Sequence, residues 1–240
     1  MQENEKRIKA FLNNFENSRE GLRESRPAFF EYFLDFSLSA LKKDESNGEE
    51  GLKNTEVSLL KKYTCSKLLL SMERLVRESG AGNDWVDIPG EIYMSQKMHD
   101  SSFGQFFTPK PICDLMARLS ADYRCAAGQK LPSVYDPTCG SGRTLLAANS
   151  LYVREYNAVP YLFGADIDSV CVKMTALNLV LHGCLGQVVC MDSLLGPASF
   201  RFGYVINETL LKTSRPSARY STDPEDFCFI NQYVNQKPAV

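Results

Sequence analysis

Three short apolar segments of this chain each end in an aspartate, and a glycine-rich turn follows the first of them. The first segment ends at Asp136 and continues as Pro-Thr-Cys-Gly-Ser-Gly to Gly142, while the other two end at Asp166 and Asp192. Because ligands of open α/β sheets bind outside the carboxyl ends of the strands, the three aspartates are expected to border one crevice. The pattern indicates a site for a single adenosine-containing ligand.

Each of these segment ends offers a different kind of contact. Glycines allow a backbone to approach a ligand closely, and the helix expected from Arg143 would present its first N–H groups to a carboxylate. A carboxylate at Asp166 could accept hydrogen bonds from both ribose hydroxyls, Ile167 could pack on an adenine ring, and Asp192 could accept from the adenine amine. Three alternatives stay open: a tight turn without a ligand, a helix N-cap at Asp166 (although Asp168 is better placed for one), and a solvated turn aspartate at Asp192.

The elements that must position these residues begin near residue 88. Apolar runs predict strands at 133–136, 161–166, 187–191 and 200–206, and helical spacing predicts helices at 111–119, 143–156 and 169–182. Alternating strands and helices imply right-handed βαβ units and a parallel sheet, so the fold class is α/β. A further strand is expected at 227–234, pairing with or covering strand 200–206, because an open apolar edge would aggregate.

The first part of the chain is expected to be a separate helical domain, residues 1–95, followed by the α/β domain, residues 96–240. Pro27 stands where a first helical turn tolerates proline. Apolar residues then recur at spacings of three and four along two predicted helices, one after Pro27 and one after Thr55, with an acidic loop between them. These stripes are typical of a bundle core, and a docking surface for a partner is the alternative.

Composition bounds the remaining possibilities. The formal net charge is −2, so the overall charge does not indicate nucleic-acid binding. The apolar runs are shorter than the ~18 residues that suggest a membrane span, and the charged N-terminus lacks a signal-peptide core; a cytoplasmic protein is expected. Eight cysteines without Cys-x-x-Cys spacing and only two histidines favour reduced core thiols over a metal site.

Taken together, the motifs resemble those of the adenine-specific DNA methyltransferases of the type I restriction–modification modification-subunit kind. The matching segments are Gly-Gln-Phe-Phe-Thr-Pro at 104–109, the turn at 136–142, Gly-Ala-Asp-Ile-Asp at 164–168 and Asp-Ser-Leu at 192–194. The resemblance implies a Rossmann-like S-adenosylmethionine-dependent methyltransferase fold with an N-terminal helical domain. It also implies S-adenosylmethionine as cofactor, DNA as substrate, and a specificity or restriction subunit as a possible partner.

The resemblance assigns a cofactor contact to each motif. Residues 106–109 and the glycine loop would hold the methionine part, Asp166 the ribose and Asp192 the adenine. The full set of cofactor-binding residues is then Phe106, Phe107, Thr108, Pro109, Asp136, Pro137, Thr138, Cys139, Gly140, Ser141, Gly142, Asp166, Ile167, Asp192 and Ser193.

The chain departs from the family pattern after the fourth predicted strand. The family has Asn-Pro-Pro followed by Tyr or Phe, whereas this chain reads Asn207-Glu208-Thr209-Leu210. Asn207 is therefore the one catalytic candidate. In the family the target adenine is flipped out of the duplex and stacks on the aromatic residue of the motif, and this stacking contributes about 1–3 kcal/mol; the chain lacks that residue. Too few residues follow Asn207 for the family's remaining strands, so a shortened sheet is expected.

Two functional hypotheses follow from these observations. One is an adenine-specific N-6 DNA methyltransferase that relies on a partner to read sequence, and the other is a catalytically inactive S-adenosylmethionine-binding or interaction protein derived from the same family. Methylation of RNA or protein is a third possibility, but no motif in the sequence supports it.

Overall fold

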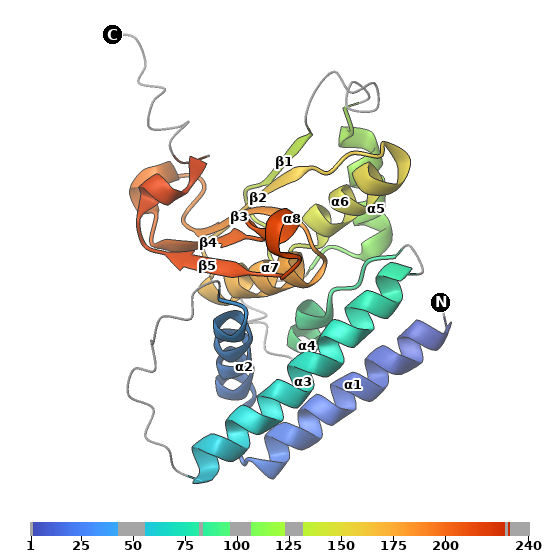
Figure 1. Cartoon of the computed structure of the whole chain (residues 1–240), viewed down its shortest axis with the longest axis vertical. Coiled ribbons are helices and arrows are strands. Elements are labelled where there is room, and N and C mark those ends of the chain that lie inside the picture. Colours follow the sequence, from blue (N-terminus) through green and yellow to red (C-terminus); the bar gives the residue numbers. More distant parts are fainter. Residues whose placement is uncertain are drawn as a thin grey trace. The chain divides into compact units, whose positions relative to one another are not determined.

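The computed structural model describes residues 2–42, 56–81, 84–96, 107–122, 132–228 and 230, and its elements are labelled in Figure 1. The chain divides into two compact units, Met1–Phe106 and Phe107–Val240. The structural border thus falls later in the chain than the sequence-based border between residues 95 and 96. Among the described segments, no helix combines the length and apolar character needed to cross a membrane.

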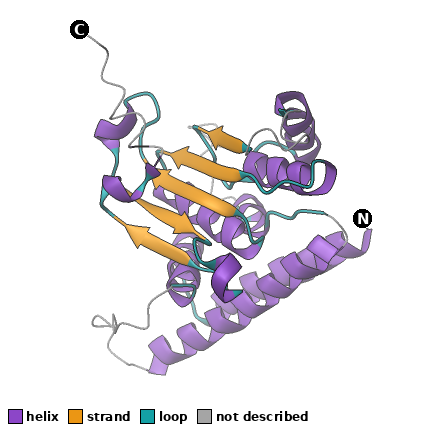
Figure 2. Ribbon diagram, turned by 45° about the horizontal axis from the view of Figure 1, so that its top comes forward, coloured by secondary structure: helices purple, strands orange, loops and turns teal. Residues whose placement is uncertain are grey.

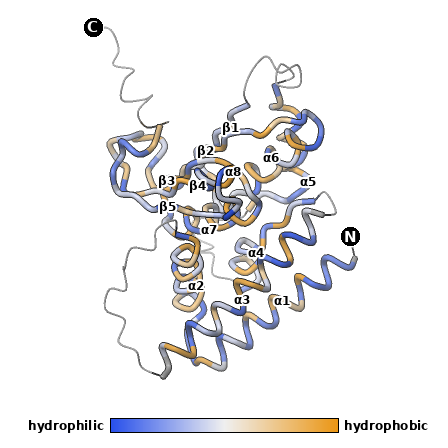
Figure 3. Tube along the Cα trace, in the orientation of Figure 1, coloured by the Kyte–Doolittle hydropathy of each residue, from blue (hydrophilic) through white to orange (hydrophobic). Residues whose placement is uncertain are grey.

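The first unit is helical. It contains α1 (Gln2–Gly21), α2 (Arg26–Ala40), α3 (Glu56–Ala81) and α4 (Ile88–Ser95). Helix α3 packs against both α1 and α2. The core of the unit includes Phe15, and the ring centroids of Phe29 and Phe33 lie 5.0 and 5.4 Å from the Phe15 centroid. Figure 3 shows α1 largely in hydrophilic colours with hydrophobic residues recurring along it, which fits a helix with one buried face.

The sequence-based boundaries of this unit are only partly met. Ser25 caps α2 and Pro27 lies in its first turn, as its position suggested. Helix α1 runs from Gln2 to Gly21, and α3 runs through Gly80 to Ala81. The acidic loop expected between the two predicted helices lies outside the described residues, as does Thr55.

The second unit is an α/β sheet with five strands in the order β1-β2-β3-β4-β5. Its main elements are α5 (Lys110–Ser120), β1 (Ser133–Asp136), α6 (Arg143–Glu155), β2 (Tyr161–Asp166), α7 (Ser169–Leu181), β3 (Leu185–Cys190), β4 (Phe202–Ile206), α8 (Leu210–Thr213) and β5 (Ala218–Ser221). Strands β1, β2 and β3 are parallel, and α6 and α7 connect them and pack against them. The predicted α/β class and Rossmann-like arrangement of this part are confirmed.

The expectation of a wholly parallel sheet is wrong for the last two strands. Strand β4 runs antiparallel to β3, and β5 runs antiparallel to β4, as the arrow directions in Figure 2 show. The reason is the connection between β3 and β4, residues 191–201, which contains only the short turn η2 (Gly196–Ser199) and no crossover helix. Parallel neighbours need a crossover of a dozen or more residues, usually helical, so a short connection returns the chain antiparallel.

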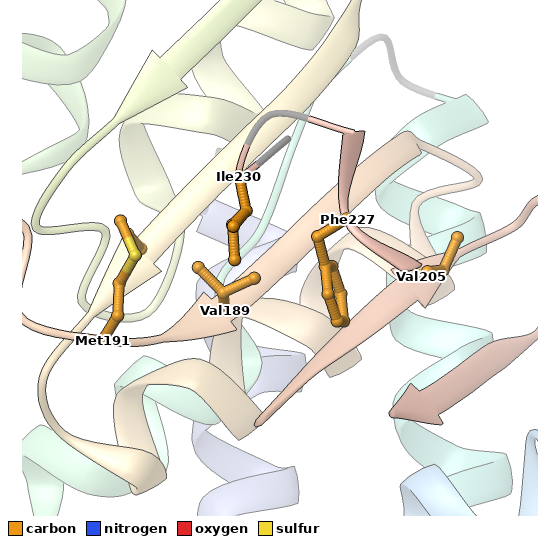
Figure 4. Close-up of a cluster of buried hydrophobic side chains, with 6 residues drawn as sticks. Val189, Met191, Val205, Phe227 and Ile230 are labelled. Atoms are coloured by element: carbon orange, nitrogen blue, oxygen red, sulfur yellow. The ribbon is translucent and has the colours of Figure 1, made fainter. Parts of the chain in front are cut away.

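The C-terminal segment covers the sheet instead of extending it. Residues 227, 228 and 230 are not in a strand, which overturns the strand predicted at 227–234 as far as the described residues go. Phe227 and Ile230 are buried against Val189 and Val205 of the sheet (Figure 4). A Cβ atom on Gly203 would come within 2.6 Å of the Phe227 ring, so β4 needs a glycine where this ring packs.

The second strand that pairs with β4 is β5, which lies in a polar stretch that contains serine and proline. In β5, Tyr220 lies opposite Tyr204, with ring centroids 5.5 Å apart. Cross-strand aromatic pairs stabilise antiparallel ladders, and this one outweighs the polar and proline-containing surroundings.

Candidate functional site

The parallel register of β1, β2 and β3 brings their carboxyl ends to one edge of the sheet. Asp136 is paired with Gly164, and Asp166 with Cys190, so each strand ends close to its neighbour. Backbone bonds continue beyond the strands, from Cys139 N–H to the Ala165 carbonyl (2.9 Å) and from Met191 N–H to the Asp166 carbonyl (3.0 Å). The structure therefore brings the three predicted segment ends together.

The glycine loop turns sharply from β1 into α6. Gly140 and Gly142 have φ values of +55° and +88°, in the left-handed region that favours glycine. Helix α6 then begins at Arg143 with no side-chain cap. The first turn of an uncapped helix presents backbone N–H groups and a partial positive charge, which suits an anionic group such as a carboxylate.

Two side chains of α7 hold this loop from behind. The Thr175 hydroxyl donates to the Gly140 carbonyl at 2.8 Å, and the Asn178 amide donates to the Ser141 carbonyl at 2.7 Å. Sequence reasoning did not assign either residue to the site. The sequence feature that could have identified them is a pair of polar residues, three positions apart, in a helix that is otherwise almost entirely apolar.

The segment before α5 lies against the same loop. A Cβ atom on Gly140 would come within 3.1 Å of the Phe107 ring. The Arg143 guanidinium lies 5.7 Å from the centre of that ring and donates to the Thr108 carbonyl at 3.5 Å. Pro109 directly precedes α5. Phe107 and Thr108 thus adjoin the glycine loop and the start of α6, whereas Phe106 lies outside the described residues.

Asp136 acts on the loop itself. Its carboxylate accepts hydrogen bonds from the Thr138 N–H (3.0 Å) and from the Thr144 hydroxyl of α6. These bonds tie the end of β1 to the first turn of α6, across the exposed Pro137 and the buried Cys139. Asp136 therefore helps to shape the turn, and any contact with a ligand would be additional.

Asp166 links the second strand end to the glycine loop. One carboxylate oxygen accepts from Gly140 N–H and the other from Asp168 N–H, both at 2.9 Å. Burial raises the pKa of the Asp166 carboxyl above its ordinary 3.8, and the two N–H bonds partly oppose this rise. The N-cap of α7 is Asp168, which accepts from Val170 N–H, so the capping alternative for Asp166 is wrong.

The third strand end forms a compact turn that reaches back to the first. One carboxylate oxygen of Asp192 accepts from Leu194 N–H at 2.8 Å, so Asp192 organises its own turn. The Ser193 hydroxyl donates to the Pro137 carbonyl at 2.5 Å, joining loops 56 residues apart. Ile167 and Leu194 are 63% and 97% exposed, so apolar side chains stand open at this edge of the sheet.

Asn207 does not join this group. Because β4 is antiparallel, the register places Ile206 opposite Gly186, at the start of β3, while Phe202 is opposite Cys190. The buried Asn207 amide donates to the carbonyls of Leu179, Val180 and Cys184 at the end of α7. This position, at the other edge of the sheet from Asp166, argues against the catalytic role expected for Asn207.

The cysteines of the described residues are all thiols, and six of the seven are buried. This agrees with the core role expected for them, except that Cys228 is exposed; Cys125 lies outside the described residues. Cys139 is the one within the glycine loop. Burial raises the pKa of its thiol well above the ordinary value, with the Asp166 charge adding to the rise. A thiol with a raised pKa stays protonated near neutral pH, which fits a packing role for Cys139 in the loop.

We predict that Gly142→Ala destabilises the protein more than its backbone angle alone requires. An alanine at a left-handed φ costs about 1–2 kcal/mol, and its Cβ would also lie 3.0 Å from the Thr175 side chain. Gly183→Ala is the matched control, because Gly183 has φ +67° but its nearest new contact would be 3.7 Å away. Urea unfolding should give a loss about 1 kcal/mol larger for Gly142→Ala; equal losses would contradict tight packing of the loop on α7.

Comparison with known proteins identifies a family and several relatives. The family model described as N-6 DNA Methylase matches residues 87–208. A type I restriction enzyme MpnII methylase subunit from Mycoplasma pneumoniae is 27% identical over 73% of the chain and 30% of its own length. The type I restriction enzyme MjaVII methylase subunit from Methanocaldococcus jannaschii is 32% identical over 41% of the chain and 16% of its own length.

A solved structure is similar at a lower level. It is a modification subunit assigned to a type I restriction enzyme from Vibrio vulnificus YJ016, with 22% identity, a TM-score of 0.40, and coverage of 57% of this chain and 28% of that one. The chain spans less than a third of the length of these relatives. Since the family model nevertheless matches more than half of the chain, the chain belongs to the N-6 DNA methylase family.

Proposed function

We propose that this chain binds S-adenosylmethionine at the edge where β1, β2 and β3 end, and that it serves as the methyl-donor part of an adenine-specific N-6 DNA methyltransferase. The observation that carries the proposal is the linkage of three loops from distant parts of the sequence. Gly140 N–H bonds to the Asp166 carboxylate, and the Ser193 hydroxyl bonds to the Pro137 carbonyl. When bound, S-adenosylmethionine would supply an electrophilic methyl group on its sulfonium.

The residues around the glycine loop fit the amino-acid part of this cofactor. The α-carboxylate is an anion, and the uncapped start of α6 offers backbone N–H groups to it. Gly140 has no side chain, so the Phe107 ring packs directly on the loop, where a Cβ atom would lie 3.1 Å from it. No phosphate-binding fingerprint is needed, which agrees with a loop that has only two glycines.

The residues after β2 and β3 fit the adenosine part. A carboxylate has about four acceptor positions, and Asp166 uses one on each oxygen for a backbone N–H. Acceptor positions therefore remain for the two ribose hydroxyls. The exposed Ile167 side chain supplies an apolar surface for the adenine ring, and Asp192 uses only one of its oxygens in its own turn.

A second candidate function is S-adenosylmethionine binding without methyl transfer by this chain. It is favoured by the position of Asn207, which is 0% exposed and bonded to the end of α7. The residue that follows, Glu208, is exposed and lies 3.7 Å from Arg219. A negative charge there would oppose a polyanionic acceptor, and neither proline of the family motif is present to stiffen the loop.

The partners proposed for the chain follow from its relatives. Those relatives are named as methylase or modification subunits of type I restriction enzymes. We accordingly propose DNA as the methyl acceptor, and a specificity or restriction subunit as the protein that brings DNA to this chain.

Calorimetric titration of the chain with S-adenosylmethionine, followed by transfer of labelled methyl to adenine-containing DNA, tests both candidates. Binding with transfer supports the methyltransferase, and binding without transfer supports the second candidate. A chain that folds but does not bind S-adenosylmethionine would overturn both. The DNA assay needs a matched duplex in which 7-deazaguanine replaces guanine, so that transfer to guanine N7 is not mistaken for adenine methylation.

A further inference from the structure

We infer that Thr175 and Asn178 of α7 are positioning residues that set the direction of the glycine loop's peptide groups toward the cofactor. The inference rests on the proposed binding of S-adenosylmethionine. Neither residue is expected to touch the cofactor. They act through the carbonyls of Gly140 and Ser141, which they hold at 2.8 and 2.7 Å.

Thr175 and Asn178 are polar residues on the otherwise mostly apolar buried surface of α7. Thr175 and Asn178 are 0% exposed, in a helix whose other buried residues include Val172, Leu177 and Val180. A buried polar group without a partner costs several kcal/mol in transfer scales, so such residues are kept where they have a specific bond to make. Both side chains direct a donor at the same loop, one helical turn apart.

The two hydrogen bonds from α7 fix the orientation of peptide groups in the glycine loop. In a trans peptide the N–H points away from the C=O of the same unit. When Thr175 holds the Gly140 carbonyl toward α7, the N–H of Ser141, in the same peptide unit, is directed away from α7. The Ser141 carbonyl is held in the same way, and the N–H of its peptide unit, Gly142, closes the turn onto Cys139 at 2.7 Å. Two donors on α7 thus determine the orientation of two successive peptides.

The Thr175 side chain also lies in direct contact with the glycine loop. A Cβ atom on Gly142 would lie 3.0 and 3.2 Å from the two branches of the Thr175 side chain. The loop therefore rests directly on this residue, and Thr175 also has its hydroxyl 3.5 Å from the Cys139 sulfur. A side chain that both supports the loop and holds its carbonyl limits how the loop can rotate. The part of the cofactor that depends on this orientation is the amino-acid part, not the adenosine.

The test compares two ligands that share adenosine. S-Adenosylmethionine carries the amino acid, and 5′-methylthioadenosine lacks it. Thr175→Val keeps the volume and removes the hydroxyl; calorimetry should show S-adenosylmethionine binding about tenfold weaker and 5′-methylthioadenosine binding changed by less than about twofold. Asn178→Asp, which removes the donor and places a carboxylate oxygen near the Ser141 carbonyl, should give a larger selective loss. Thr175→Ser keeps the hydroxyl and should restore the parent ratio.

Leu177→Ala is the control for general destabilisation, because Leu177 is buried on the other side of α7 from Thr175. It should lower stability without changing the ratio of the two affinities. Equal losses for both ligands in Thr175→Val, or no loss, would overturn the inference. If the parent chain does not bind S-adenosylmethionine, the proposed function fails instead. Amide hydrogen exchange then decides the inference: Ser141 and Gly142 should exchange faster in Thr175→Val than in Leu177→Ala.

Discussion

Asp166→Ala is expected to weaken S-adenosylmethionine binding by about a hundredfold, because it removes the acceptor that we propose for two ribose hydroxyls and the acceptor that holds Gly140 N–H. Hydrogen bonds to a charged group contribute about 1.5–3 kcal/mol each, and 1.4 kcal/mol is a factor of ten in affinity. Calorimetry measures the change. The matched control is Asp168→Ala, which removes the N-cap of α7 and should cost about 1 kcal/mol of stability while leaving the affinity within a few-fold.

The same carboxyl makes binding depend on pH in a definite direction. Burial raises the pKa of Asp166, and protonation removes acceptors that the ribose needs, so affinity should fall as the pH is lowered through a midpoint above 3.8. A carboxyl with a raised pKa in the folded state favours folding at low pH and loses that contribution as the pH rises, so Asp166 does not itself promote acid unfolding. Affinity should therefore fall while the protein stays folded. An affinity independent of pH, or equal losses in Asp166→Ala and Asp168→Ala, would contradict the role of Asp166.

Asn207→Ala is expected to lower the free energy of unfolding by about 3 kcal/mol while leaving S-adenosylmethionine affinity within a few-fold. The Asn207 amide donates to three carbonyls near the end of α7, and its oxygen accepts from Ser217 N–H at 2.9 Å. Loss of buried partners costs about 1–3 kcal/mol per unsatisfied group. Asn207 also has φ +55°, which asparagine tolerates better than alanine. Urea unfolding and calorimetry on the same samples separate the two effects.

Asn207→Gly is the matched control for the backbone angle, since glycine accepts a positive φ without strain but brings no amide. It should remain less stable than the parent, and the difference from Asn207→Ala estimates the strain. A variant that keeps its stability but loses cofactor binding or methyl transfer would restore the catalytic role that the family motif suggested. That outcome would require β4 to end at the same edge of the sheet as β1, β2 and β3.

These two residues show how far sequence patterns can be followed. The segment ending at Asp166 was predicted from local information: an apolar run, a following acidic residue and the helix after it. The strand bounds Ser133–Asp136 and Tyr161–Asp166 agree with the structure. Parallel strands joined by helices meet at one edge for geometric reasons, so three such segments imply one site without any knowledge of side-chain contacts.

Asn207 was placed by its position in a motif, and the motif does not contain the direction of the strand before it. That direction depends on the connection at residues 191–201, which contains the short η2 but no crossover helix, and on the pairing of β4 with β5. The sequence of β5 looks polar. In the structure, only Ala218 of this strand is fully buried, and Tyr220 is half-exposed. Cross-strand packing against Tyr204 is a long-range effect that local composition does not reveal.

The glycine turn, the acidic strand ends and the family of the chain could be predicted from the sequence, since these depend on residue types at short spacing. The packed fold was needed to see that Thr175 and Asn178 hold the glycine loop, that Phe227 covers the sheet, and that the Asn207 amide binds the carbonyls at the end of α7. Each of these contacts joins residues more than twenty positions apart in the chain. Their partners are chosen by how the elements pack, and packing is not encoded in any one segment.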